Sequence, residues 1–165
     1  MSRRPPFEPI HFAKHLEESG NYTSDNSLIY AWSGTHWMAL EDATVERMAL
    51  QWIAENGSGI VTATNARSAH QTALRWLPLI EEPTNACIIP VQNGYLHLEH
   101  GVVLKPHDKS LGMRHVLSCD FDPAAPTPLE FKGFIESILP DPAVRERVQE
   151  YIGYCLIPRN KGQRM

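Results

Sequence analysis

The chain has 165 residues, of which 42% are hydrophobic and 21% charged, a composition that is ordinary for a globular protein of one compact domain or one domain with a small appendage. Its formal net charge of −4 argues against a dedicated nucleic-acid binder, because such proteins usually carry a basic excess. Without a long apolar run, a secretory signal or closely paired cysteines, the sequence predicts a cytoplasmic protein with no membrane partner and no disulfide framework.

The first half of the chain predicts a helix, an aromatic hairpin and two further helices. Apolar residues recur there at spacings of three and four, and two β-prone runs surround the turn 33–35. Asp42 is a good N-cap for the second helix, and Pro78 stops the third. The expected helices cover residues 9–19, 42–56 and 65–77, and the expected strands cover residues 27–32 and 36–40.

The second half predicts short strands followed by two helices. Turn-forming pairs such as Asn93-Gly94 join three β-type runs. Residues 127–130 have the pattern of a capping box with Pro128 at the first helical position, and Asp141-Pro142 repeats the cap-and-proline device. The expected strands cover residues 86–91, 94–99, 102–106 and 114–119, and the two helices follow these start signals.

Tight turns between strands predict an α+β fold with antiparallel hairpins or a meander, rather than a parallel βαβ sheet. The last two helices carry apolar stripes that repeat at three and four, and we expect them to form an antiparallel pair. This pair should bury Phe134, Ile138, Val148 and Ile152. The expected organisation is an α+β part over 1–85, a meander with the helix pair over 86–157 and a basic tail or linker over 158–165, with one compact domain overall as the alternative.

Three histidines, His97, His100 and His107, crowd one predicted hairpin. A catalytic zinc needs three ligands that converge at about 2 Å from the metal. His97 and His100 lie three apart on a strand that runs into a turn, so an extended backbone directs them to opposite faces. Surface histidines are therefore the favoured interpretation; no metal or other cofactor is expected, and the role of the three stays open.

Asp120 and Asp122 form a D-x-D pattern. On a strand, two carboxylates two residues apart point to one face, which is how nucleotidyl transferases hold magnesium ions. A third carboxylate and a basic triphosphate site are not evident, and the pattern also fits a strand that ends in a proline-rich turn. A divergent metal-dependent primase that uses this pair is kept as an alternative.

The four tryptophans are candidates for stacking on bases, because an aromatic ring offers a flat face to every base. Trp52 and Trp76 fall at helical core positions, whereas Trp32 and Trp37 flank a tight turn. Core packing is the favoured role for at least two of them.

A local cationic run without neighbouring carboxylates lies near residue 165, and its members are Arg159, Lys161 and Arg164. These three are the candidate nucleic-acid contacts. The net charge of −4 permits only a few phosphate contacts, so we expect weak binding. A solvated tail without a DNA role is the alternative.

Several short motifs follow one another between about residues 90 and 156. An Asn-Gly hairpin leads to a Phe-Asp-Pro turn, then to a helix pair joined by Leu-Pro-Asp, and finally to a Tyr-Ile-Gly-Tyr segment. The residues are Asn93, Gly94, Leu96, Phe121, Asp122, Pro123, Phe134, Leu139, Pro140, Asp141, Tyr151, Ile152, Gly153 and Tyr154. This order resembles the region that precedes the superfamily 3 helicase core in phage, plasmid and poxvirus primase–helicases, and residues 28–40 resemble the aromatic first hairpin of that family.

The resemblance implies a non-catalytic accessory domain of a mobile-element DNA-replication primase–helicase, which guides DNA to a ring-shaped motor and helps to assemble it. The implied partners are DNA and the helicase ATPase domain or other subunits of the ring. No Walker motif is present here, so we expect no ATPase activity from this chain. In that family the first ATPase strand follows shortly after the Gly-Tyr helix, so we expect a domain fragment, a truncated gene product or a free-standing relative. A full-length protein would be an ATP-dependent DNA helicase. Gly153 would let another backbone pack close to its helix. A protein–protein adaptor is the second alternative.

Overall fold

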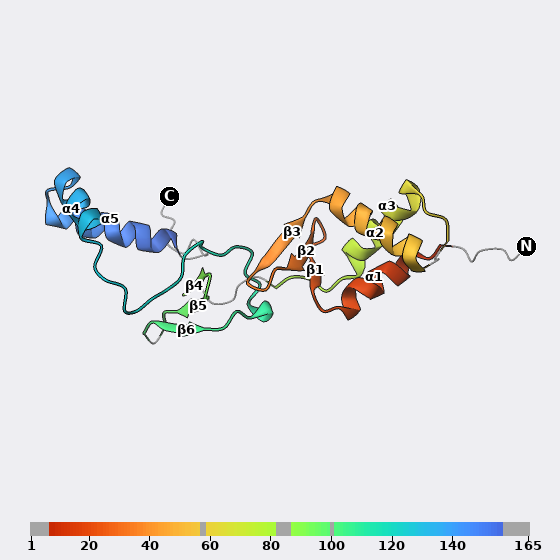
Figure 1. The fold of residues 1–165 in the computed structure, drawn as a ribbon, viewed down its shortest axis with the longest axis horizontal. Coiled ribbons are helices and arrows are strands. Elements are labelled where there is room, and N and C mark those ends of the chain that lie inside the picture. Colours follow the sequence, from red (N-terminus) through yellow and green to blue (C-terminus); the bar gives the residue numbers. More distant parts are fainter. Residues whose placement is uncertain (1–6, 57–58, 82–86, 100, 157–165) are drawn as a thin grey trace, which may run out of the picture. The chain divides into compact units, whose positions relative to one another are not determined.

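The computed structural model describes residues 7–56, 59–81, 87–99 and 101–156 (Figure 1). The chain divides into two units: unit 1 comprises residues 1–82 and 108–115, and unit 2 comprises residues 83–107 and 116–165. Two antiparallel three-stranded sheets and five α-helices lie within the described ranges, so the predicted α+β class is confirmed. In these ranges no helix has both the length and the apolar character that a membrane crossing requires.

The elements follow the predicted ranges to within a few residues. Unit 1 contains α1 (Pro9–Glu18), β1 (Tyr22–Ser24), β2 (Ile29–Trp32), β3 (Trp37–Leu40), α2 (Asp42–Asn56), α3 (Ala63–Trp76) and the short 3₁₀ helix η1 (Lys109–Leu111). Unit 2 contains β4 (Ile88–Val91), β5 (Gly94–His97), β6 (Val103–Lys105), α4 (Leu129–Ile138) and α5 (Pro142–Cys155). The sequence pattern did not predict β1, which adds a third strand to the aromatic hairpin.

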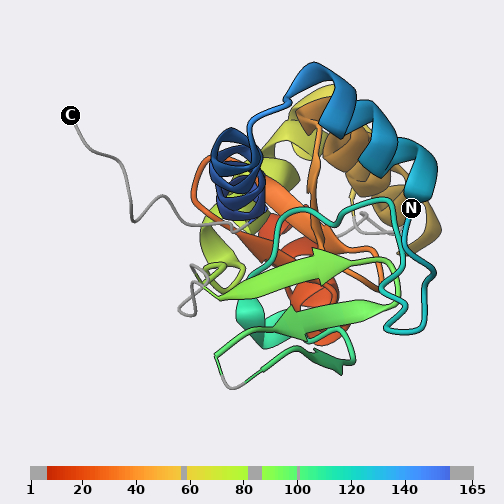
Figure 2. The same cartoon turned by 90° about the vertical axis from the view of Figure 1, so that its left-hand side faces the viewer.

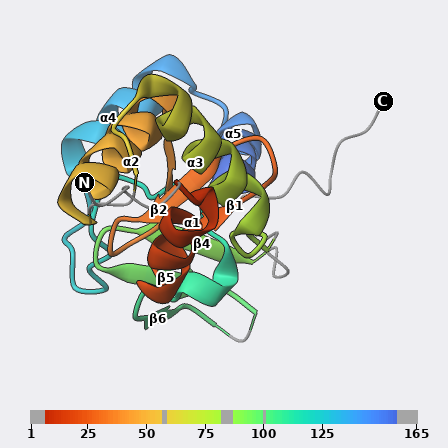
Figure 3. The same ribbon diagram turned by 90° about the vertical axis from the view of Figure 1, so that its right-hand side faces the viewer.

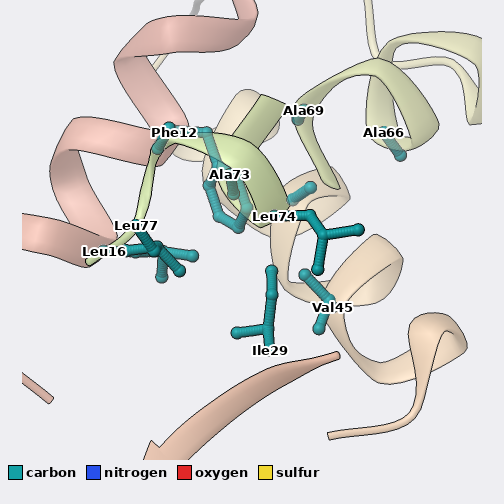
Figure 4. Close-up of a cluster of buried hydrophobic side chains, with 11 residues drawn as sticks. Phe12, Leu16, Ile29, Val45, Ala66, Ala69, Ala73, Leu74 and Leu77 are labelled. Carbon is teal, nitrogen blue, oxygen red and sulfur yellow. The ribbon is translucent and has the colours of Figure 1, made fainter. Parts of the chain in front are cut away.

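The three helices of unit 1, seen nearest the viewer in Figure 3, enclose an apolar core that also takes in the first sheet. Small residues on one face of α3, namely Ala66, Ala69 and Ala73, let the neighbouring helices approach closely. Phe12 of α1 and Ile29 of β2 reach the same cluster, as Figure 4 shows. The core therefore joins elements from both the helices and the sheet.

Residues 108–115 belong to unit 1, although they follow the strands of unit 2 along the chain. The backbone N–H of Trp37 donates to the carbonyl of Met113 at 2.8 Å. The indole Nε1 of Trp37 also donates to the carbonyl of Lys109 at 3.0 Å. Met113 is only 1% exposed, so this returning segment supplies part of the interior of unit 1.

The sheet of unit 2 is the hairpin β4–β5, visible as two neighbouring green arrows in Figure 2, extended by β6. Its central side chain is Tyr95, which is fully buried and meets the ring of His107 edge-on at a centroid distance of 4.9 Å. His107 in turn places Nε2 at 2.9 Å from the carbonyl oxygen of Val91. His107, which follows β6 in the chain, thus holds the β4–β5 hairpin from one side.

The predicted strand over 114–119 is wrong. Leu117 forms an isolated bridge with Val91, in which its N–H donates to the carbonyl of Pro90 at 2.9 Å. Since the residues up to 115 return to unit 1, too little chain remains beside β4 to continue a ladder.

The prediction of two consecutive C-terminal helices is confirmed. Of the two N-caps predicted for them, one is correct and one is wrong. Asp141 caps α5 as predicted, because its carboxylate accepts the N–H of Ala143 at 2.9 Å. The predicted capping box at Thr127 is wrong: Pro128 occupies the N-cap position, and no side chain caps α4. The helix begins one residue later than the box requires, which moves Thr127 outside the capping position.

The predicted burial of the C-terminal helix pair is also wrong. Phe134, Ile138 and Ile152 are 58%, 52% and 53% exposed, and Val148 is half-buried. None of the described residues of α4 or α5 is fully buried. Apolar spacing predicts which side chains share a helix face, but it does not specify what covers that face.

Candidate functional site

An open cleft in unit 1 lies between α1, α2, β1 and the β2–β3 hairpin, with a volume of about 670 Å³. Ligand pockets commonly measure about 300–1,000 Å³, so the cleft is large enough for a small molecule or one unit of a polymer. Aromatic residues from four elements line it, namely Phe12 and His15 of α1, Tyr22 of β1, Trp32 of β2 and Trp52 of α2. The aromatic first hairpin and the amphipathic helices of the sequence thus meet at one concave surface.

Two half-buried tryptophans form the main walls of this aromatic cleft. Trp52 meets Phe12 edge-on at a centroid distance of 5.9 Å, and His15 lies 6.0 Å from the same indole. Trp32 meets Trp37 edge-on at 5.4 Å. Because Phe12 and Trp37 are both buried, each wall is anchored from behind while part of its surface faces solvent.

Polar groups surround the aromatic walls. The Lys109 ammonium lies 6.0 Å from the centroid of the Trp32 ring and donates to the carbonyl of Gly20 and to Oδ1 of Asn21. On the other side, Gln51 and Glu55 line the cleft from one face of α2, one turn apart. These polar residues were not identified from the sequence. The positions of Gln51 and Glu55, one turn apart on the helix that carries Trp52, could have indicated two of them. Lys109 could not be identified in this way, because the returning segment brings it beside two lining residues, Trp32 and Asn21.

The placement of Trp76 differs from the prediction of a core position. This residue is 44% exposed, and its indole N–H donates to the carboxylate of Glu17 at 2.7 Å. The ammonium of Lys14 lies 5.9 Å from the ring centroid. Trp76 is the last residue of α3, where α1 covers only part of the indole.

In unit 2, Asn93 connects two of the motifs that the sequence singled out. Its amide Nδ2 donates to the carbonyl of Phe121 at 2.9 Å, and its Oδ1 accepts the N–H of Phe121 at 3.0 Å. The side chain therefore pairs with both backbone groups of one residue in the Phe-Asp-Pro turn. This Asn93 clamp gives a structural reason for the joint occurrence of the Asn-Gly hairpin and that turn.

Replacing Asn93 by alanine is expected to lower the free energy of unfolding of unit 2 by about 1–2 kcal/mol, because two hydrogen bonds to Phe121 are lost. Gln92→Ala is the matched control, since Gln92 is an exposed amide in the same turn. Hydrogen exchange of the β4–β5 amides measures the effect. Equal protection in the two variants would show that the clamp contributes no stability.

Asp120 and Asp122 do not lie on a strand, so they do not form the pair of carboxylates on one strand face that the metal-site hypothesis requires. Asp120 and Asp122 lie in irregular backbone, and Asp122 accepts the N–H of Ala124 at 2.8 Å in a turn that Pro123 begins. Among the described residues, no group of three acidic, histidine or cysteine side chains is placed to hold a metal ion. The carboxylate of Asp122 therefore stabilises the turn through this hydrogen bond.

The remaining motif residues lie in the C-terminal helix pair and its connection. Arg145 donates to the carbonyls of Leu139 and Pro140 at 2.7 and 2.9 Å and so closes the turn before α5. Tyr151 is 69% exposed and Tyr154 is half-buried. A Cβ at Gly153 would meet no atom within 4 Å, so the backbone that was expected to pack there is not found in the described part of the chain.

The cationic candidates Arg159, Lys161 and Arg164 lie outside the described residues, as does His100. Of the other histidines, His107 bonds to Val91 as described above, and His97 lies on β5. Burial, reinforced by the charge of Lys105, lowers the pKa of His97 below its usual value.

A family model described as "D5 N terminal like" matches residues 10–140. No curated protein matches the sequence. The matched range includes the aromatic cleft, the Asn93 clamp and the whole of α4.

Proposed function

The chain belongs to the D5 N-terminal-like family, the domain that precedes the helicase core in phage, plasmid and poxvirus primase–helicases, and from this premise we propose that it guides single-stranded DNA toward the motor as a non-catalytic module. The observation that carries the proposal is the aromatic cleft. Partly exposed aromatic walls beside a cation are a common means by which proteins hold single strands, because bases stack on the rings and the cation attracts the backbone.

The same module is proposed to help assemble the helicase ring. Its C-terminal helices expose large apolar side chains, which in monomeric proteins often mark interaction sites. On α4 and α5 these residues are Leu129, Phe131, Phe134, Ile138, Val144, Tyr151 and Ile152. The proposed partners are the helicase ATPase domain or other subunits of the ring.

A catalytic role finds less support. A primase that used Asp120 and Asp122 would need both carboxylates on one face of a strand, but they occupy irregular backbone and one of them is engaged in a turn. The primase alternative predicts primer synthesis that Asp120→Asn abolishes. The proposed module has no such activity.

Binding of fluorescent single-stranded DNA by the intact chain is expected to be weak and to weaken with salt. Each phosphate contact contributes about −0.7 to the slope of log affinity against log salt. If Arg159, Lys161 and Arg164 each make one contact, a chain that ends at Ile157 should have a slope shallower by about 2.

Titrations of the two chains at several salt concentrations measure this difference. Equal slopes would exclude the tail from the DNA path but leave the cleft as the site. No binding by the intact chain, even at low salt, would overturn the DNA-guiding function and favour the adaptor alternative.

A further inference from the structure

We propose that the aromatic cleft holds one unpaired base of single-stranded DNA. The base stacks on the solvent-facing indole surface of Trp32 and Trp52, and its polar edge is directed to Glu55. This inference deepens the proposed function and rests on it: it names the site of the contact and the bases that the site prefers.

The walls of the cleft suit a flat ring better than a flexible aliphatic chain. Trp32 and Trp52 are half-buried, and edge-on contacts with Trp37 and Phe12 hold them in place. A stacking platform that is already fixed loses little side-chain freedom when the ligand binds. The two indoles are therefore prepared for stacking before a base arrives.

The rim provides a charge for the phosphate of the same nucleotide. The Lys109 ammonium is fixed by the carbonyl of Gly20 and by Oδ1 of Asn21, which are neutral acceptors, at 2.9 and 2.6 Å. Within the described ranges, no carboxylate forms an ion pair with it. Its positive charge thus stays available beside Trp32 for the phosphate of a nucleotide that stacks there.

Trp76 lacks this combination and is a natural comparison. It also has a lysine nearby and is more exposed than Trp32, but its indole N–H donates to the carboxylate of Glu17. The negative charge of Glu17 opposes the approach of a phosphate. We therefore expect the cleft, and not the end of α3, to bind the nucleotide.

The polar wall favours bases that carry an exocyclic amino group. At neutral pH a carboxylate only accepts hydrogen bonds, so Glu55 needs a donor from the base. Cytosine presents an amino group at ring position 4, where thymine presents a carbonyl oxygen. The one ring donor of thymine, N3–H, lies between two carbonyl oxygens, which repel a carboxylate. Proteins that track the backbone alone lack such a contact, so a preference for cytosine over thymine is specific to this proposal.

The test compares oligo(dC) and oligo(dT) of equal length by fluorescence anisotropy at pH 7.5 and low salt. The proteins are the intact chain, Trp32→Leu, Glu55→Gln and the control Trp76→Leu. We expect the intact chain to bind oligo(dC) about fivefold more tightly than oligo(dT). Trp32→Leu should weaken both by about tenfold, Glu55→Gln should reduce the preference to within about twofold, and Trp76→Leu should behave as the intact chain.

Glu55 is exposed, so its variant tests the proposal even if Trp32→Leu disturbs the fold. DNA binding that neither cleft variant alters would overturn the base site while leaving the DNA-guiding function in place. Absence of DNA binding by the intact chain would overturn both. A loss on Trp76→Leu equal to that on Trp32→Leu would move the contact to α3 and likewise overturn the assignment to the cleft.

Discussion

Replacing Phe12 by alanine is expected to lower the free energy of unfolding of unit 1 by about 3–5 kcal/mol. Phe12 is 1% exposed and lies in the core that joins the three helices to the first sheet. Phe12 also contacts Trp52 edge-on. The cavity that the missing ring leaves therefore cannot close without moving Trp52, which is a wall of the cleft. All four tryptophans lie in residues 1–82, which makes their fluorescence during urea unfolding a direct measure of unit 1.

Phe134→Ala is the matched control, because it removes the same ring from a residue that is 58% exposed on α4. We expect a change below about 1 kcal/mol in the isolated chain, since exposed substitutions away from special features have small effects. A loss of several kcal/mol at Phe134 would mean that α4 buries this side chain in solution. Equal, small losses at both positions would contradict the core described for unit 1.

Replacing Gly94 by alanine is expected to destabilise the β4–β5 hairpin by about 2–3 kcal/mol. The φ angle of Gly94 is +154°, and an added Cβ would overlap the carbonyl oxygen of Lys105 and lie 2.8 Å from Cδ1 of Leu104. The first of these neighbours is a backbone atom, so relief requires a shift of the β6 backbone at Lys105 or of the hairpin itself. Hydrogen exchange of the amides of residues 88–97 measures the loss.

Gly133→Ala is the control, because it replaces glycine by alanine at a position where the added Cβ has no close neighbour. Gly133 lies within α4, and a Cβ there would meet no atom within 4 Å. Alanine is favoured over glycine in a helix interior, so this variant should gain about 0.5–1 kcal/mol. If Gly94→Ala also gained stability, the close approach of β6 to the hairpin would be contradicted.

The local elements could be predicted from the sequence because their causes are local. Apolar spacing around Ala66 and Ala73 indicated α3, and the Asn93-Gly94 pair indicated the turn between β4 and β5. Asp141 identified the start of α5, because a side chain that caps a helix acts within three residues.

The contacts that build the candidate site could not be predicted, because they join distant residues. Lys109 reaches Asn21 across 88 positions, and Asn93 reaches Phe121 across 28. Neither pair follows a period that a single sequence displays. On α4 the sequence predicted burial that the structure does not show. Phe134 and Ile138 have the spacing of core residues, but that spacing is equally compatible with a surface that meets another molecule.

The returning segment 108–115 also bears on how the protein is made. A ribosome releases residues 1–82 first, but β3 then lacks the carbonyl of Met113 as a partner for Trp37, and the interior lacks the Met113 side chain. Synthesis of residues 83–115 takes roughly 2–7 s at translation rates of about 5–20 residues per second. During this interval β3, an edge strand of its sheet, lacks this hydrogen bond and the packing of Met113, and exposed strand edges invite aggregation. Translation pauses after residue 115 would therefore help folding, whereas pauses before residue 108 would prolong the vulnerable state.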